Sequence, residues 1–255
     1  MMKITILSLG LFLVLGLNGL KAQKIYTTAS GEMIFSWSEA AYTDQDPDNL
    51  TYGNKKNIGT IGDALRFTLW FHLTFNWHLD FNNNIGLFTG IGNRNIGFIT
   101  TESSSVIDAN SGDFYDLKWK RRSYALGVPL ALKLGNFKKG YFIYAGAQYE
   151  WLYHYKEKEF QNTGKRKQTE WFSNRTTNLL PSAFVGIAFP HGMSIKFTYA
   201  LQDFMNKSYT DGAGTQPYKY MDSKIMYISV FSFIKWKKET YEKVEKKENK
   251  IAWNY

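Results

Sequence analysis

The chain has 255 residues, no cysteine, a formal net charge of +9 and 44 aromatic residues (19 Phe, 17 Tyr and 8 Trp). The absence of cysteine excludes disulfides, thiolate metal sites and a cysteine nucleophile. The excess of basic residues favours an anionic partner, and an anionic membrane leaflet fits it as well as a nucleic acid does. No stretch after residue 22 is apolar for long enough to form a transmembrane helix.

Residues 1–22 have the three-part layout of a secretory signal peptide. Lys3 supplies the positive start, Ile4 to Leu17 form an apolar stretch that is short for a membrane span, and the segment ends in the small residue Ala22. We expect cleavage between Ala22 and Gln23, and therefore an exported mature chain. The alternative is an uncleaved membrane anchor, which usually has about 20 apolar residues and no early small-residue exit.

The clearest predicted element is the segment from Leu65 to Phe81, in which every odd position is apolar. These positions are Leu65, Phe67, Leu69, Phe71, Leu73, Phe75, Trp77, Leu79 and Phe81. The even positions between them are polar, with the exception of Trp70. A period of two predicts a strand with two chemically different sides and excludes a helix face. A strand of this length can cross a bilayer, because a crossing needs about 9 to 11 residues tilted by about 45°.

Seven further segments repeat this alternation, although the first and last leave open which face is apolar. In chain order, the eight predicted strands are Glu32 to Trp37, Leu65 to Phe81, Ile85 to Phe98, Ser123 to Leu134, Tyr141 to Tyr155, Leu179 to Phe189, Met193 to Gln202 and Lys224 to Trp236. Eight is an even number, as single-chain bacterial barrels require.

The connections between these strands alternate in length. Short turns rich in Asn, Gly and Pro lie at 82–84, 135–140 and 190–192, and long polar stretches lie at 42–63, 101–117, 156–177 and 205–223. Bacterial barrels have short periplasmic turns and long extracellular loops. The sequence therefore predicts an all-β fold, an eight-stranded antiparallel up-and-down transmembrane β-barrel over residues 23–236 with both termini in the periplasm. A charged periplasmic tail over 237–255 would follow, either solvated or docked on a partner.

The hairpin at the centre of the chain resembles a known family. Leu126 to Lys133 follow the pattern Leu-x-x-Pro-Leu-x-Leu-Lys, and Tyr141 to Gln148 come after a Gly-bounded turn. This hairpin is similar to that of the outer-membrane β-barrel domain family common in Bacteroidetes, which includes PorT-like proteins. The resemblance covers roughly residues 30 to 236 and implies the architecture rather than an activity. The chain departs from many members in continuing after Trp236.

Ionisable side chains at predicted inward positions form a candidate polar network of the lumen. They are Arg66, His72, Arg94, Lys133, Glu150 and Lys196. Side chains fill the interior of an eight-stranded barrel, so we expect a buried ionic network rather than a conducting pore or a binding pocket. Six aromatic residues near predicted strand ends form a candidate girdle at the two membrane interfaces. They are Trp77, Phe81, Tyr141, Trp151, Tyr153 and Tyr155.

The sequence predicts no catalytic, cofactor-binding or metal-binding residue. His72, His78, Asp80 and His154 are the acid-base candidates, but His154 is not part of a His-x-Ser motif like that of the lipid A deacylase barrels. We therefore predict a structural or surface-recognition protein of the cell outer membrane that acts through its external loops.

The expected partners are outer-membrane lipids and lipopolysaccharide, together with a periplasmic or surface protein. No nucleic-acid partner is expected, because the Lys-rich runs are not interleaved with inward-facing aromatic residues. Two alternatives from other classes stay open at this point. One is a PorT-like assembly factor of a protein secretion system, and the other is a lipid-modifying outer-membrane enzyme.

Overall fold

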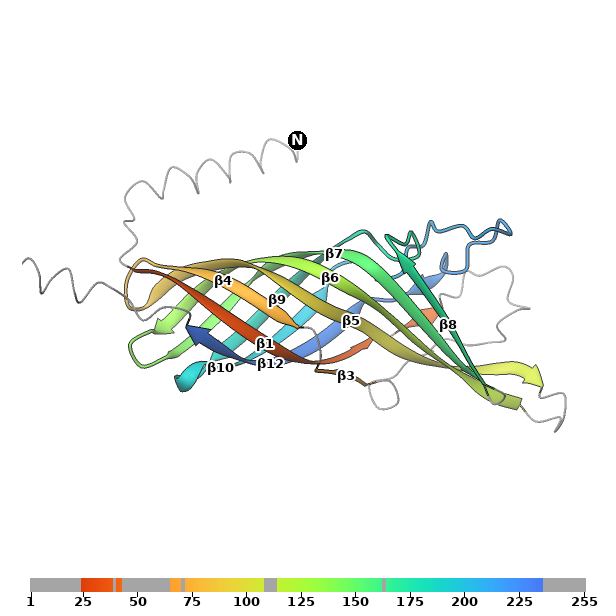
Figure 1. The fold of residues 1–255 in the computed structure, drawn as a ribbon, viewed down its shortest axis with the longest axis horizontal. Helices are drawn as coiled ribbons and strands as arrows, with labels where there is room; N and C mark the ends of the chain where they lie inside the picture. The colour runs from red at the N-terminus through yellow and green to blue at the C-terminus, as the bar shows by residue number, and fades with distance from the viewer. Residues whose placement is uncertain are drawn as a thin grey trace, which may run out of the picture.

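The structure is a computed structural model that describes residues 24–38, 40–42, 65–69, 72–107, 114–161 and 164–235 (Figure 1). The regular elements of these residues are β-strands and one short 3-10 turn at Pro190–Gly192. Within this described part, no helix is long and apolar enough to cross a bilayer. The predicted signal peptide with its cleavage site at Ala22 and Gln23, and the predicted tail over 237–255, lie outside the described residues.

Eight antiparallel strands close into a ring. In ring order they are β1 (Lys24–Ser38), β4 (Leu73–Asp80), β5 (Ile85–Ile107), β6 (Phe114–Asn136), β7 (Tyr141–Gln161), β9 (Leu179–Ala188), β10 (Met193–Ala200) and β12 (Ile225–Lys235). Each pairs with its neighbour in the chain, and β12 pairs back with β1 from Thr28↔Lys235 to Ser38↔Ile225. The predicted eight-stranded antiparallel up-and-down barrel is confirmed.

The two faces of the barrel wall are inverted relative to a soluble protein. On β4, Leu73 and Phe75 are exposed on the outer face, whereas Thr74 and Asn76 are buried inside. The same holds on β6, where Leu130 is 58% exposed and the inward-facing Lys133 is fully buried. An apolar exterior around a polar interior is the arrangement of a transmembrane barrel, whose solvent is lipid.

Two expectations about strand boundaries are wrong. The predicted continuous strand from Leu65 to Phe81 is described as two pieces, β3 (Arg66–Thr68) and β4, which both pair with β1. The expected external loops at 101–117 and 156–177 are largely sheet, because β5, β6 and β7 run on and β8 (Gly164–Trp171) pairs with β7. On β7 in this sheet, Lys156 and Lys158 alternate with Glu157 and Glu159, so the alternation there is one of charge and not of hydrophobicity.

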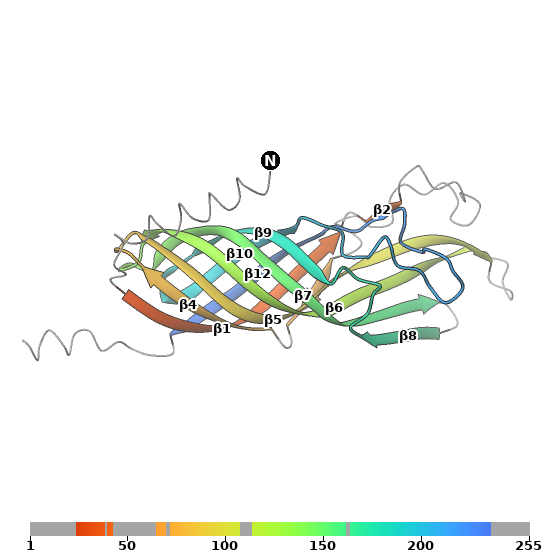
Figure 2. The same ribbon diagram turned by 90° about the horizontal axis from the view of Figure 1, so that it is seen from above.

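The barrel has two different ends (Figures 1 and 2). The short turns at 81–84, 137–140 and 190–192 lie at the end where β1 begins, since Lys24 pairs with Asp80. At the other end, β5 to β8 project beyond the barrel as a sheet that we call the outer extension. A two-stranded sheet of β2 (Ala41–Tyr42) and β11 (Met221–Asp222) also lies at this end.

Apolar side chains fill the lumen in two separate clusters. The cluster towards the outer extension includes Phe204, Met205, Tyr218 and Met221 from the connection between β10 and β12, which folds into the mouth of the barrel. The cluster towards the short turns is made of Phe88, Ala131, Tyr144, Phe184, Ala188 and Phe231. The polar residues between these clusters form the candidate site.

Candidate functional site

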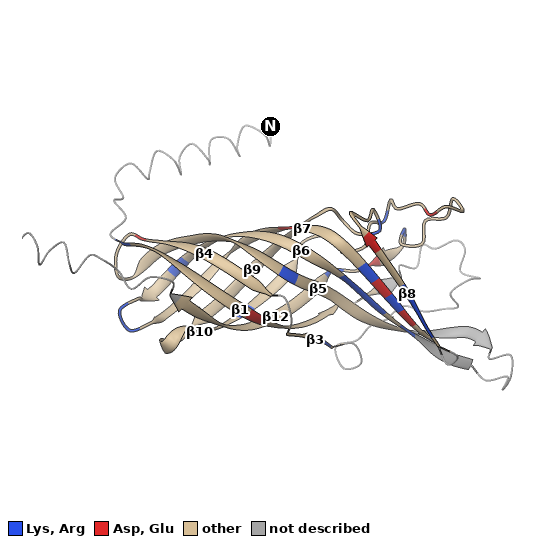
Figure 3. Ribbon diagram, viewed as in Figure 1, with Lys and Arg blue, Asp and Glu red and all other residues tan. Residues whose placement is uncertain are grey.

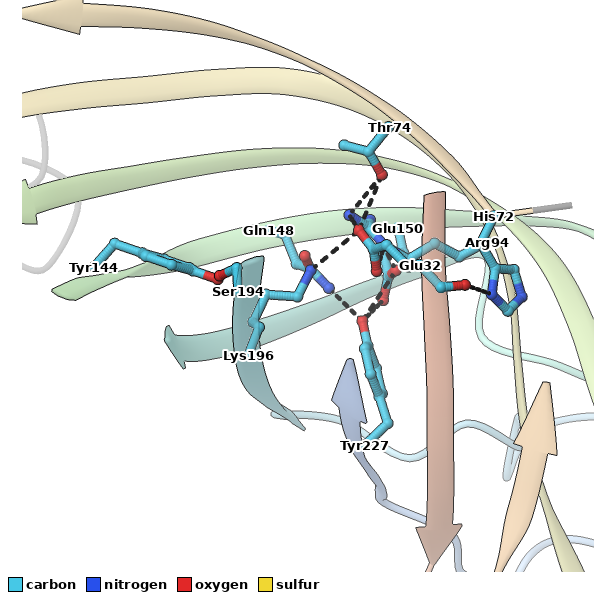
Figure 4. A network of polar contacts seen from close by, with 10 residues as sticks. All are labelled: Glu32, His72, Thr74, Arg94, Tyr144, Gln148, Glu150, Ser194, Lys196 and Tyr227. Carbon is cyan, nitrogen blue, oxygen red and sulfur yellow. Dashed lines mark hydrogen bonds and ion pairs between the residues drawn. The ribbon is translucent and has the colours of Figure 1, made fainter. Parts of the chain in front are cut away.

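Four ionisable side chains from four different strands meet between the two apolar clusters (Figure 4). Glu32 on β1 accepts hydrogen bonds from Arg94 on β5, at 3.2 Å from Nε and 3.1 Å from Nη2. Its Oε1 also lies 3.5 Å from Lys196 Nζ on β10. Arg94 Nη1 lies 3.5 Å from Glu150 Oε1 on β7. Two carboxylates and two cations therefore balance one another in formal charge, as buried ions must.

Neutral groups satisfy further bonds of these ions. Thr74 donates to Glu32 Oε1 at 3.0 Å, and the Tyr227 hydroxyl lies 3.3 Å from both oxygens of Glu150. Gln148 Nε2 donates to the same hydroxyl at 2.6 Å. The chain thus uses residues of β1, β4, β5, β7, β10 and β12 in one connected network. Such a network fixes the relative positions of strands that are far apart in sequence.

A glycine makes room for the central arginine. Gly127 on β6 faces inward beside Arg94, and a Cβ built on it would lie 2.7 Å from Arg94 Nη1. Any larger residue there would push the guanidinium away from Glu32 and Glu150. Small inward residues beside large ones are how a narrow barrel fills its interior.

The network closes the lumen at its level. The void lined by Glu32, Arg94 and Lys196 has a volume of only about 10 Å³. A cavity of this size holds one water molecule at most. The apolar clusters lie on both sides of it. This void therefore leaves little room for water beside the network.

The structure divides the predicted lumen residues into separate groups. Arg94, Glu150 and Lys196 meet in the network, and His72 is attached through its Nδ1, which lies 2.9 Å from the Glu32 carbonyl oxygen. Arg66 is buried elsewhere and donates to the backbone oxygen and Oδ1 of Asn95. The expectation of a single network is wrong for Arg66 and for Lys133, because their strands place them too far from Glu32 along the barrel axis.

Lys133 belongs to a second cluster near the short turns. Its Nζ contacts Asp80 Oδ1 and lies 3.2 Å from both His78 Nδ1 and the Tyr26 hydroxyl. A pocket of about 450 Å³ opens beside this cluster, and its walls include Tyr26, His78, Phe142 and Phe233. His78 and Asp80 are thereby engaged with a lysine rather than with each other as an acid-base pair.

Sequence reasoning missed Glu32, the acid that holds the network together. The signal was the polar even positions of its segment, Ser30, Glu32, Ser36 and Ser38, which are all buried. The alternation of β1 is weak because the opposite positions include Gly31 and mixed apolar residues. The facing of this strand was consequently left open.

The candidate girdle residues lie on the outer face with one exception. Trp77, Tyr141 and Trp151 are between 43% and 51% exposed, and Phe81 and Tyr153 are half-buried. Tyr155 is only 1% exposed and points inward, where its hydroxyl donates to Glu157. Its assignment to the girdle is wrong, because the register between β6 and β7 shifts at Tyr124/Ala125 and inserts one extra residue, Tyr153, into β7.

Three solved structures that are similar to this chain are barrels of outer-membrane proteins. Ail of Yersinia pestis, in complex with the heparin analogue sucrose octasulfate, is 13% identical with a TM-score of 0.32, over 81% of this chain and 97% of Ail. Neisserial surface protein A is 8% identical with a TM-score of 0.36, over 83% and 97%. The N-terminal β-barrel domain of Pseudomonas aeruginosa OprF is 9% identical with a TM-score of 0.30, over 83% and 100%. No family model and no curated protein matches the sequence.

The last acid-base candidate, His154, lies on the outer face where the barrel meets the outer extension. Its ring is 4.3 Å from that of Trp171 and 5.6 Å from that of Tyr124. Within the described residues, no hydrogen bond joins it to a hydroxyl or a carboxylate, and no group of three or more potential metal ligands occurs.

Beside it, Glu170 on β8 accepts hydrogen bonds from Ser173 at 2.6 Å and from Arg175 at 3.0 Å. Partial burial acts to raise the pKa of Glu170, but these bonds and the charge of Arg175 outweigh it and lower the pKa. Arg175 in turn donates to the Tyr218 hydroxyl at 3.3 Å. These contacts fasten the end of β8 to the connection that folds into the barrel mouth.

Proposed function

We propose that this chain is an exported outer-membrane barrel protein with a closed lumen, whose role is structural or surface recognition and not conduction or catalysis. The observation that carries this proposal is the ion network of Glu32, Arg94, Glu150 and Lys196, which occupies the barrel cross-section with a residual void of about 10 Å³. The surface that differs most from the barrel wall is the outer extension, so recognition is assigned to it.

The outer face of β6 supports a membrane location. From Leu134 to Tyr124, its outward positions are Leu134, Leu132, Leu130, Val128, Leu126 and Tyr124, and Arg122 follows. These eleven residues, ten steps along the strand, rise about 33 Å, which a tilt near 40° reduces to about 25 Å across the membrane. That distance equals the usual height of the apolar band of such barrels. An aromatic residue and then a cation follow where the band ends.

Two measurements test the proposal: conductance in a planar bilayer, and mobility on SDS gels before and after boiling. Full-length protein reconstituted into a planar bilayer should give no stepwise current, since no water path crosses the ion network. The same preparation should migrate differently on SDS gels before and after boiling, because a closed barrel has no free edge from which to unfold. Stepwise currents from protein that passes the gel assay would contradict the closed lumen while leaving the barrel intact.

A second candidate role is that of an assembly factor like the PorT-like proteins of the family that the central hairpin resembles. The pocket of about 450 Å³ at the short-turn end favours it, because its walls combine Phe142 and Phe233 with the polar Tyr26 and His78. A photo-crosslinking residue at Lys139, on this end, should then capture a discrete periplasmic protein. The same residue at Lys219, on the opposite end, is the control. Capture from neither position would count against this role.

A further inference from the structure

The outer extension has one strongly basic face. Seven cations of β6, β7 and β8 point to the same side of the sheet, and we call this surface the basic face. They are Lys118, Lys120, Arg122, Lys156, Lys158, Lys165 and Lys167. Residues directly opposite in neighbouring strands share a side, and the pairs Arg122↔Lys156, Lys120↔Lys158 and Lys158↔Lys167 establish this. Among the described side chains, no Asp or Glu lies on this face. Figure 3 shows that charged residues of both signs gather on the strands beside β8, and the register assigns the cations to one side.

The described acidic side chains of β7 and β8 are on the other side. On β7, Lys156 and Lys158 alternate with Glu157 and Glu159, which are buried on the inner face. Glu157 Oε2 accepts a hydrogen bond from Arg121 Nε at 3.0 Å. The acids are therefore held on the inner face and do not neutralise the outer one.

Like charges are crowded on the basic face. Lys120, Lys158 and Lys167 form a row across three adjacent strands, and like charges directly opposite each other destabilise a sheet. The pKa values of Lys120 and Lys158 are lowered by partial burial and by neighbouring cations. Such crowding is relieved when anions bind between the ammonium groups.

The face lies where a membrane surface begins. It continues the lipid-facing side of β6, whose outward positions change from Leu126 to Tyr124 to Arg122. At about 2.5 Å of height per residue, Arg122 is about 5 Å and Lys118 about 15 Å beyond Tyr124. Aromatic rings of Trp171, Tyr153 and His154 border it on the membrane side. The cations thus face sideways, at the height of lipid headgroups.

We propose that the basic face binds the phosphate groups of lipopolysaccharide in the outer leaflet. This inference rests on the membrane location proposed above, and it assigns a ligand chemistry and a site to the recognition role. A lipid ligand is favoured over a soluble polyanion, because the face points along the membrane plane and is continuous with the lipid-facing wall. Neighbouring lysines on separate strands can bind one phosphate together.

The test compares two triple variants with the same change of charge. Lys120→Gln/Lys158→Gln/Lys167→Gln removes the central row of the basic face. Lys138→Gln/Lys139→Gln/Lys219→Gln removes three exposed lysines elsewhere and is the control. Each full-length protein, refolded in a zwitterionic detergent, is titrated with lipopolysaccharide, with phosphatase-treated lipopolysaccharide and with a heparin fragment. Tryptophan fluorescence reports binding, since Trp171 borders the face.

Wild type and control should bind lipopolysaccharide alike, and the row variant about tenfold to hundredfold more weakly, as expected for three lysines at an anionic surface. Phosphatase treatment should weaken wild-type binding and leave the row variant nearly unchanged. Equal binding by the row variant, or no effect of phosphatase, would overturn the proposal. If the row variant lost binding to the heparin fragment but kept binding to lipopolysaccharide, the face would be assigned to a soluble polyanion. That result would also overturn the proposal.

Two further measurements separate failure of this inference from failure of the proposed function. Migration on SDS gels before and after boiling shows whether each variant forms a closed barrel, independently of any ligand. The denaturation midpoint without lipopolysaccharide should be higher for the row variant than for wild type, because repulsion is removed. A row variant that folds less well than wild type in the absence of anions would contradict the crowding on which the inference depends.

Discussion

The barrel wall and the outer extension share the strands β6 and β7, but these strands direct different kinds of side chain outward in the two regions. In the wall, β6 and β7 direct Leu130 and Ile143 outward and Lys133 and Glu150 inward. In the extension, the same two strands direct lysines outward and the Arg121–Glu157 pair inward. The strands pair in the same antiparallel way in both regions, and apart from the extra residue Tyr153 in β7 the main difference is the solvent of the outer face. A period of two therefore marks both regions, but its chemical content depends on whether lipid or water is outside.

The wall and the extension should also differ in how much stability is lost when one partner of an ion pair is removed. The ions of the wall network are almost fully buried, whereas the Glu170–Arg175 pair at the end of β8 is partly exposed to water. The same kind of ion pair should therefore matter much more inside the wall. Three experiments test the comparison between wall and extension, from the largest expected effect to the smallest.

Glu32→Gln should cause the largest loss. It removes a buried carboxylate that contacts both Arg94 and Lys196, leaving one acid, Glu150, for two cations. Breaking a buried ion pair by removing one partner costs about 3 to 5 kcal/mol. Glu170→Gln, which breaks the partly exposed pair with Arg175 in the extension, should cost about 1 kcal/mol or less. The measurement is the free energy of unfolding in urea for protein refolded in lipid vesicles.

Both variants change one carboxylate to an amide of nearly the same shape, so they differ mainly in surroundings. Comparable losses for Glu32→Gln and Glu170→Gln would mean that water reaches the lumen network. That result would also weaken the closed-lumen proposal, whatever the conductance.

Leu130→Arg and Leu134→Arg test the lipid solvent of the wall with identical chemistry. Both leucines are exposed on the outer face of β6, Leu130 near the middle of the apolar band and Leu134 at its short-turn end. An arginine at the membrane midplane costs roughly 2 to 4 kcal/mol, and one near the interface about 0 to 1 kcal/mol. Unfolding in vesicles measures both. If the outer face were solvated by water, neither substitution would be costly.

Most of the fold could be predicted from the sequence because lipid imposes a strict alternation on the wall. Every barrel strand was found, and the weakest patterns belonged to the first and last strands. The extension was missed, since residues 156–171 are mostly polar and a hydrophobicity pattern finds no strand in them. Alternation of charge sign from Lys156 to Glu159 was the signal that could have revealed the continuation of β7, whereas β8, with Lys165, Arg166 and Lys167 in succession, carries no such signal.

The candidate site was predicted less completely, for two physical reasons. Whether a side chain faces inward could be inferred from parity, that is, from whether its sequence position is odd or even. The position of each residue along the barrel axis, however, depends on the register between tilted strands. Parity alone therefore grouped Lys133 with Arg94, although Lys133 pairs with Asp80. Parity itself failed at Tyr155, where one extra residue in β7 reverses the facing of everything beyond it.

The smallest expected effect is the response of the extension to acid. Because the pKa of Glu170 is lowered in the folded protein, its contribution is fully present above its ordinary value of 4.5 and is lost as the pH falls through the lowered value. The loss should stay below about 1 kcal/mol, since solvent screens the pair with Arg175. Limited proteolysis of the connection at 172–178 with an acid-tolerant protease should therefore accelerate in wild type as the pH falls below 4.5 and through the lowered pKa of Glu170. Glu170→Gln should be cleaved at the faster rate at every pH, and a wild type that shows no acceleration would mean that Glu170 does not fasten the end of β8.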